Sequence, residues 1–137
     1  MNARVILAAV VSAVVMMGIG FALFGVLLND WYAQQTLAAK SRINDPPVMW
    51  ALFLAQLMFS LLLAVIFERY AVIRTFAGGA VAGVWIGFLV FMSFDLAMFA
   101  FYKIASLQFA LIDGLLSTVM AAINGAVVGF VLGFKRT

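Results

Sequence analysis

The chain has 137 residues, of which 68% are hydrophobic and 9% are charged, and its formal net charge is +3. A water-soluble domain is roughly half apolar and about one quarter charged, so this composition excludes a soluble globular protein and indicates an integral membrane protein. The chain has no cysteine and no histidine, so haem ligands and ordinary zinc sites are excluded, and any metal would be a hard cation held by oxygen. We expect no cofactor.

Four apolar runs follow one another along the chain, each near or above the ~20 residues that a helix needs to cross a bilayer. They predict transmembrane helices over residues 5–28, 48–67, 75–102 and 106–134. Because most connections are short, we expect one all-α domain over residues 1–137, built as an antiparallel four-helix bundle.

The main polar segment, residues 29–47, forms the outer loop between the first two helices. Asp30 could cap a surface helix that reaches Ala39, with an ordered irregular loop as the alternative. Trp31 and Tyr32 stand where an interfacial aromatic belt would lie. At the end of the loop, Asp45 is a candidate cap for the second helix, and the two prolines that follow it fit the first helical turn.

Basic residues favour one side of the predicted bundle. That side carries Arg4, Arg69, Arg74, Lys135 and Arg136, and the other side carries Lys40, Arg42 and Lys103. Excess basic residues mark the cytoplasmic side, so we predict a bacterial inner-membrane protein with both termini in the cytoplasm. The position of these residues beside apolar runs indicates membrane topology rather than nucleic-acid binding.

Two glycine ladders with a spacing of four residues mark the third and fourth helices. Their members are Gly79, Gly83 and Gly87 on the third helix and Gly125, Gly129 and Gly133 on the fourth. In lipid, small residues let helix backbones approach closely and so supply the packing energy. The ladders therefore either hold these two helices together or present a face to a second protomer in a homo-oligomer.

Two aspartates interrupt the apolar runs of the third and fourth helices. The midpoint between Asp95 and Asp113 is Ile104, inside the predicted outer turn. Residues equidistant from the turn of an antiparallel hairpin lie at the same depth, so the two carboxyl groups should be level with each other. Acidic residues inside a membrane are costly and are therefore candidates for function. The pair could bind a proton or a cation, form a structural polar clasp or cap, or contact a partner.

Further polar side chains are predicted to line a small cavity in the outer half of the bundle, beside the aspartates. On the fourth helix, Ser117 and Asn124 share a face with Asp113, since they follow it by one and three helical turns. The other candidates are Ser93 on the third helix and Gln56 and Ser60 on the second.

Short motifs around the aspartates resemble a known family. They comprise Phe24-Gly25-Val26, Trp31-Tyr32, Gln35, Phe94-Asp95-Leu96, Phe99-Ala100, Lys103 and Leu111-Ile112-Asp113. With these motifs the chain resembles the small bacterial four-helix membrane proteins of domain-of-unknown-function family 2177. It departs from that family's pattern at Ala97-Met98, Ala105-Ser106 and Leu116-Ser117. The resemblance implies the four-helix fold and the aspartate pair, and it implies no activity.

These observations lead to three hypotheses about function. The first is a small non-enzymatic membrane protein, resembling a transporter or channel, whose aspartate pair binds a proton, a cation or a cationic solute. The second is an accessory subunit that packs into a larger membrane complex through a glycine face. The third is a membrane enzyme that acts on lipid or quinone, with the two carboxyl groups as acid and base.

Overall fold

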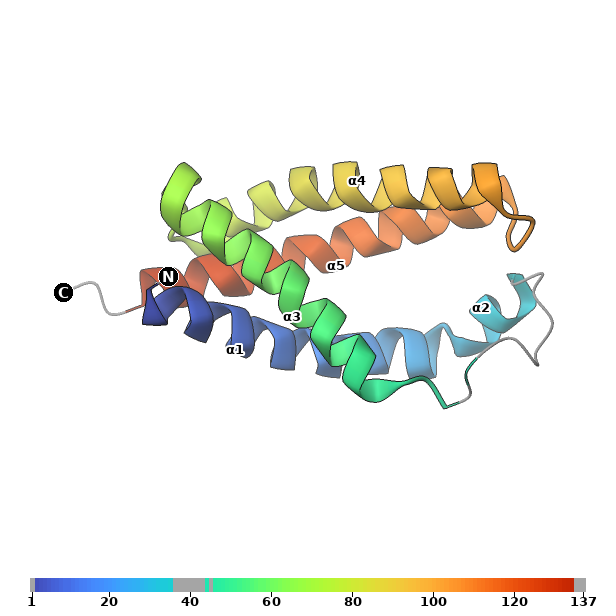
Figure 1. Cartoon of the computed structure of the whole chain (residues 1–137), viewed down its shortest axis with the longest axis horizontal. Helices are drawn as coiled ribbons and strands as arrows, with labels where there is room; N and C mark the ends of the chain where they lie inside the picture. The colour runs from blue at the N-terminus through green and yellow to red at the C-terminus, as the bar shows by residue number, and fades with distance from the viewer. Residues whose placement is uncertain (1, 36–43, 45, 135–137) are drawn as a thin grey trace.

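The computed structural model describes residues 2–35, 44 and 46–134. Within these residues the chain is helical and has no strand. Four of the described helices are long and apolar enough to cross a membrane. The span Met49–Ala71 crosses the molecule obliquely, whereas the other spans follow its long axis (Figure 1). The predicted all-α class and the four apolar spans are confirmed.

The first span consists of α1 (Ala3–Gly20) and a π-helical segment, η1 (Phe21–Leu27), that continues it. The wider turn is marked by the Leu28 N–H, which donates to the carbonyl of Leu23 at 2.8 Å. The short helix α2 (Asn29–Gln35) follows directly.

The predicted surface helix is therefore present over its described part, whereas residues 36–39 lie outside the described residues. The prediction that Asp30 caps this helix is wrong, because α2 includes Asn29 and Asp30 lies inside its first turn.

The second span consists of α3 (Met49–Ile66) and the π-helical segment η3 (Phe67–Ala71), which carries the helix beyond its predicted end. Pro46 and Pro47 precede α3 instead of forming its first turn. Val48 has an extended backbone with ψ of 93° and no side-chain cap. Pro46 is followed by Pro47, and a residue that precedes proline is disfavoured from helical geometry. The predicted cap, Asp45, lies outside the described residues.

The third and fourth spans are α4 (Phe76–Phe101) and α5 (Leu107–Gly133). The hydroxyl oxygens of Thr75 and Ser106 cap them, accepting from the Gly78 and Phe109 N–H groups at 3.1 Å each. Such caps satisfy backbone donors that have no partner within the helix. The positions of both helices agree closely with the sequence prediction.

Helices α4 and α5 lie side by side along most of their length (Figure 1), and the glycine ladders face each other between them. Gly79 lies against the backbone of Gly125, and Gly83 lies against the backbone of Ala121, so closely that neither glycine leaves room for a methyl group. Both ladders are thus occupied within the chain, and a second protomer would have to use a different face.

The tightly packed core lies in the half of the molecule that contains both termini. It joins α1, α3 and α5 through Val5, Ala8, Ala9, Leu63, Ala64, Phe67, Val128 and Leu132, all of them buried. Small residues on α1 and α3 bring these helices close together. We call this the inner half and the opposite half the outer half.

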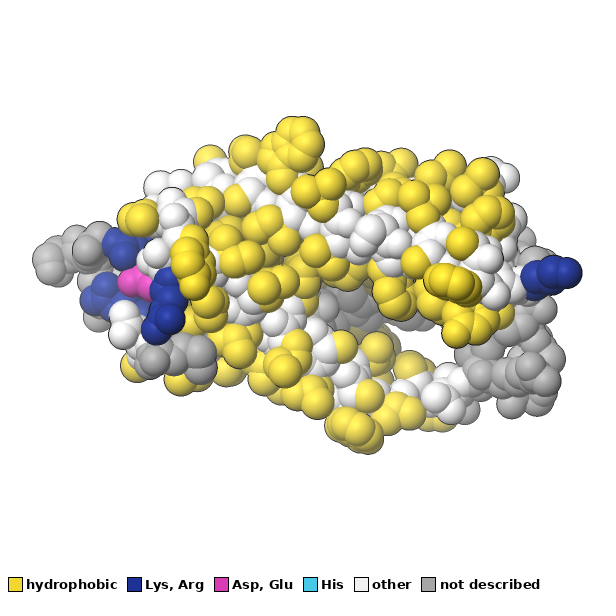
Figure 2. All heavy atoms as spheres, turned by 45° about the horizontal axis from the view of Figure 1, so that its top comes forward, with side chains coloured by type: hydrophobic (Ala, Val, Ile, Leu, Met, Phe, Trp, Pro, Cys, Tyr) yellow, Lys and Arg dark blue, Asp and Glu magenta, His cyan; other side chains and the backbone are white. Residues whose placement is uncertain are grey.

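Charged side chains gather at the end of the inner half, where α1 begins and α5 ends (Figure 2). There the Arg74 guanidinium binds the Glu68 carboxylate through two contacts of 3.0 and 3.1 Å. The predicted basic positions Lys40, Arg42, Lys135 and Arg136 lie outside the described residues. The faces between the two ends expose apolar side chains such as Trp85, Leu89 and Val119, as expected of helices that contact lipid.

Candidate functional site

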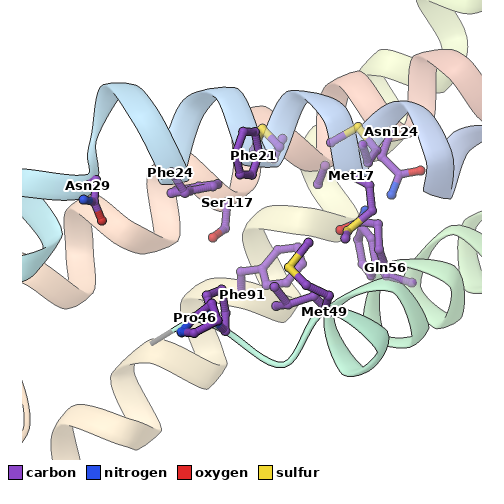
Figure 3. Close-up of a pocket in the computed structure, with 18 residues that line it drawn as sticks. Met17, Phe21, Phe24, Asn29, Pro46, Met49, Gln56, Phe91, Ser117 and Asn124 are labelled. Carbon is purple, nitrogen blue, oxygen red and sulfur yellow. The ribbon is translucent and has the colours of Figure 1, made fainter. Parts of the chain in front are cut away.

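A cavity of about 670 Å³ occupies the outer half, between the α1–η1 span and helices α3, α4 and α5 (Figure 3). Ligand-binding pockets for small organic molecules usually enclose about 300–1,000 Å³. The described residues that line it are Met16, Met17, Gly20, Phe21, Phe24, Gly25, Asn29, Pro46, Pro47, Met49, Leu52, Gln56, Phe59, Phe91, Ser117, Met120, Ala121 and Asn124. The cavity is therefore large enough for an organic molecule rather than only for an ion and a few waters.

The cavity is present because the helices carry small side chains at their contacts in the inner half and larger side chains in the outer half. In the inner half, alanines such as Ala8 and Ala64 are fully buried at the contacts. In the outer half, the α1–η1 span instead presents Phe21 and Phe24 to the cavity wall. Large side chains on both sides keep α1 and α3 further apart, which leaves space that the side chains do not fill.

The lining is mostly apolar and carries four methionines. Methionine is unbranched and flexible, so it adapts to ligands of different shape. None of the described lining residues has a charged side chain. The walls thus suit an uncharged, largely apolar molecule.

A buried polar cluster lies at the inner end of the cavity and is centred on Asn124, which is fully buried. Its Oδ1 accepts from the Ser12 hydroxyl at 2.6 Å and from the Ser60 hydroxyl at 3.1 Å. The cluster therefore ties α5 to both α1 and α3 at the level where the packed inner half ends.

The other atom of this amide, Asn124 Nδ2, has no hydrogen-bond partner in the described structure. An unsatisfied buried donor costs about 1–3 kcal/mol. Oδ1 is engaged by both serines. Asn124 forms part of the cavity lining (Figure 3), so Nδ2 is the amide atom left to face the cavity. The inner end of the cavity thus offers one hydrogen-bond donor without an acceptor.

The remaining polar lining is neutral. Gln56 on α3 lies near Asn124, while Asn29 and Pro46 lie at the outer end of the cavity (Figure 3). Ser117 lies between these ends on α5. The middle of the cavity is therefore apolar apart from Ser117, and further polar groups lie at the two ends.

The two aspartates form a separate cluster outside the cavity lining. The Tyr32 hydroxyl on α2 donates a short hydrogen bond to Asp113 Oδ1. A Cβ atom on Gly114 would lie 3.2 Å from Asp95 Oδ2, so Asp95 reaches across to α5 beside Asp113. Asp95 Oδ2 is buried and has no hydrogen-bond partner in the described structure.

Tyr32 belongs to an aromatic cluster that joins α2 to the bundle. Its ring makes edge-to-face contacts with Phe24 at 5.4 Å and Phe109 at 5.4 Å, and Trp31 stacks on Phe109 at 5.7 Å. Burial, followed by the hydrogen bond and the charge of Asp113, raises the pKa of the Tyr32 phenol far above its ordinary value. The phenol is therefore kept as a neutral donor.

The structure divides the predicted polar residues among three places. Gln56, Ser117 and Asn124 line the cavity, and Ser60 is buried behind it. Asp95 and Asp113 form the separate aspartate cluster. Ser93 belongs to neither site, because its hydroxyl is exposed and donates to the carbonyl of Val90 on its own helix. Asp113 does not cap α5, whose cap is Ser106.

Two functional candidates were missing from the predicted set of site residues. Ser12 is the only hydroxyl side chain in the first apolar run, and this isolated polar residue was a usable signal. Tyr32 was assigned only to the interfacial belt, and nothing in the local sequence connects it with Asp113. No group of three or more acidic, histidine or cysteine side chains that could hold a metal occurs within the described part of the chain.

The fold and these sites define an all-helical protein with four candidate membrane spans. Residues 7–129 match the family described as Protein of unknown function (DUF1761), and the chain belongs to that family. The resemblance to family 2177 is therefore wrong. The motifs behind it are short and mostly apolar, and such motifs recur in unrelated membrane helices because lipid selects apolar residues. No curated protein and no solved structure matches the chain.

Proposed function

We propose that this protein is a non-enzymatic membrane protein that binds a small, largely apolar molecule in the outer cavity. The carrying observation is the cavity of about 670 Å³ with an uncharged lining of methionine and aromatic side chains. A cavity of this size and character matches the general properties of sites for organic ligands.

The proposed setting is the bacterial inner membrane, with an antiparallel arrangement of the four spans and both termini in the cytoplasm. The charged cluster of Arg4, Glu68, Arg69 and Arg74 at the inner end supports this orientation, since excess basic residues mark the cytoplasmic side. The cavity would then lie in the half of the membrane that faces away from the cytoplasm.

The test of cavity binding uses two glycines of α1. A Cβ atom on Gly20 would lie in the cavity wall, 3.9 Å from the Met120 side chain, whereas a Cβ atom on Gly18 meets nothing within 4 Å. Gly20→Leu should therefore fill the cavity without a clash, and Gly18→Leu is the matched control.

Binding is measured by equilibrium dialysis of radiolabelled 2-methylnaphthalene with the protein in lipid nanodiscs, with empty nanodiscs as background. We expect saturable binding to the wild type and to Gly18→Leu, and at least a tenfold loss in Gly20→Leu. Equal uptake by all three proteins and by empty nanodiscs would refute the proposal.

A second candidate function is the binding of a proton, a cation or a cationic solute by the aspartate cluster. The specific observation in its favour is the buried Asp95 Oδ2 without a hydrogen-bond partner beside the Tyr32–Asp113 pair. Intramembrane carboxyl groups that exchange protons react with hydrophobic carbodiimides, so peptide mass mapping after such treatment should find Asp95 modified. Asp30→Asn is the control, and modification that survives Asp95→Asn at the same level would exclude this site.

The accessory-subunit hypothesis lacks a structural observation of its own. The six glycines through which it was predicted to act are already in close contact within the chain, where α5 packs against α4 and against Arg74 and Thr75 just before it. Homo-oligomerisation and assembly into a larger complex stay predictions that need another surface.

A further inference from the structure

We infer that the cavity selects a neutral molecule with a carbonyl oxygen, and that Asn124 Nδ2 donates the hydrogen bond that recognises this oxygen. The inference rests on the proposed function and adds the chemical class of the ligand. It also assigns one residue as the determinant of selectivity.

The amide of Asn124 is held in one orientation by its neighbours. Its Oδ1 accepts two hydrogen bonds, from Ser12 on α1 and from Ser60 on α3, and the Ser12 hydroxyl also lies 3.3 Å from the backbone carbonyl of Asn124. With Oδ1 engaged by both serine hydroxyls, Nδ2 is the amide atom that is left for the cavity.

A fixed donor without an acceptor selects a ligand that brings an acceptor. Buried amide groups in folded proteins are almost always hydrogen-bonded, so the orphaned Nδ2 is a specific exception that requires an explanation. A carbonyl oxygen supplies the acceptor without carrying a charge, which agrees with the uncharged described lining. A ligand with an alkyl chain or ring alone would leave the donor unsatisfied.

Access to this donor depends on the methionines at the inner end of the cavity. Asn124 is fully buried, and Met17 and Met120 line the cavity near it. Rotation of such flexible thioether side chains opens a path at low energetic cost. The carbonyl end of the ligand would therefore lie innermost, with its apolar body between Phe21, Phe24 and Phe91.

Two natural sources share this chemistry, a quinone ring and the ester of an acyl chain. The experiment uses one probe for each, 2-methyl-1,4-naphthoquinone and methyl dodecanoate, and pairs them with the hydrocarbons 2-methylnaphthalene and dodecane. The chain has no cysteine, so the quinone cannot form a thiol adduct.

Two variants separate the effect of the Asn124 donor from the effect of the serines that bind its oxygen. Asn124→Leu alone leaves two serine hydroxyls without their acceptor, so the main variant is the triple change Ser12→Ala, Ser60→Ala and Asn124→Leu, which replaces the whole cluster by apolar groups. The control is Ser12→Ala with Ser60→Ala, which keeps the Asn124 amide.

Selectivity is the ratio of the dissociation constants of each carbonyl probe and its hydrocarbon, measured in nanodiscs. Comparison of this ratio between proteins cancels the partition of each probe into lipid. In the triple variant, the preference for at least one carbonyl probe over its hydrocarbon should fall by about threefold to tenfold relative to the wild type. This is the effect expected from the loss of one net hydrogen bond. The double serine variant keeps the Asn124 amide and should therefore retain more of that preference than the triple variant.

A second measurement observes the donor directly. The chain has four asparagines, Asn2, Asn29, Asn44 and Asn124, so selective ¹⁵N-asparagine labelling gives few side-chain amide signals, and the triple variant identifies that of Asn124. This signal should shift with the carbonyl probe that shows the preference and move far less with the matching hydrocarbon.

The outcomes separate this inference from the proposed function. In one outcome, hydrocarbons and carbonyl probes both bind the wild type, Gly20→Leu abolishes the binding of both, and the triple variant keeps the wild-type selectivity ratio. The cavity then binds ligands, but the role of Asn124 is overturned. If no probe binds above the nanodisc background, the proposed function fails, and the inference fails with it.

Discussion

The Ser12 hydroxyl on α1 donates a 2.6 Å hydrogen bond to Asn124 Oδ1 on α5, at the level where the packed inner half meets the cavity. Ser60 on α3 donates to the same oxygen at 3.1 Å. All three side chains are fully buried. One asparagine oxygen therefore connects three of the four spans.

This shared acceptor predicts a non-additive effect on stability. Asn124→Leu should destabilise the protein by about 1–3 kcal/mol, because it leaves buried serine hydroxyls without their acceptor. The triple change Ser12→Ala, Ser60→Ala and Asn124→Leu should recover most of this loss, because it removes donors and acceptor together. The measurement is equilibrium unfolding in mixed detergent micelles followed by circular dichroism.

The matched control for this series is Ser93→Ala. The Ser93 hydroxyl is exposed and bonds only within its own helix, so its removal should change the free energy of unfolding by no more than about 0.5 kcal/mol. A triple variant less stable than Asn124→Leu would contradict the idea of a shared acceptor.

The Tyr32–Asp113 hydrogen bond predicts a pH dependence. Burial and the neighbouring Asp113 raise the pKa of the Tyr32 phenol in the folded protein above its ordinary value of about 10, so below pH 10 the phenol is neutral in both the folded and unfolded states. Above pH 10 the unfolded phenol loses its proton while the folded one keeps it. The stability that Tyr32 contributes is therefore complete below pH 10 and declines as the pH rises beyond that value.

Absorbance at 295 nm, which reports phenolate, measures this effect by comparison of the wild type with Tyr32→Phe. In the folded state, the two proteins should show almost the same increase up to pH 11. After unfolding in denaturant, the wild type should exceed the variant by the signal of one tyrosine. An excess of that size already in the folded protein at pH 11 would show that the phenol is not held neutral.

Much of this fold was predictable from the sequence, since lipid demands long apolar helices with internally satisfied backbones. The bounds of α4 and α5 were predicted closely because clear breaks in hydropathy mark them, and in the structure Thr75 and Ser106 cap their first turns. The π-helical segments were not predicted. Phe21–Leu27 is as apolar as the α-helix before it, whereas Phe67–Ala71 includes Glu68 and Arg69 at the end of its span. Hydropathy carries no information about the width of a turn in either case.

The candidate site was predictable in its parts but not in its grouping. Helical spacing placed Asp113, Ser117 and Asn124 on one face of α5, yet only Ser117 and Asn124 line the cavity. Asp113 is instead engaged by Tyr32, from a loop helix whose position over the bundle depends on tertiary contacts. A pattern within one helix cannot specify which neighbouring segment covers each turn.

The close contact between α4 and α5 predicts that the same substitution has different effects at two glycines, Gly83 inside this contact and Gly18 outside it. Gly83→Ala should destabilise the protein by about 1–3 kcal/mol, because the methyl group would collide with the backbone of Ala121 and force α4 and α5 apart. Gly18→Ala meets open space and should leave stability unchanged or raise it by up to about 1 kcal/mol, because alanine favours the helix. Thermal unfolding of the detergent-solubilised variants distinguishes the two, and equal losses would contradict the close contact.

The proposed orientation predicts which ends of the helices react from outside the cell. Because the chain has no cysteine, a single introduced cysteine is the unique target of a membrane-impermeant maleimide. Asn2 precedes α1 at the end that carries Arg4 and Arg74, whereas Lys103 lies in the exposed turn between α4 and α5 at the opposite end. With the outer membrane made permeable, Lys103→Cys should react in cells with an intact inner membrane, and Asn2→Cys should react only after that membrane is disrupted. The reverse pattern would place the termini outside and the cavity in the cytoplasmic half, while reaction of both sites in intact cells would contradict the spanning arrangement itself.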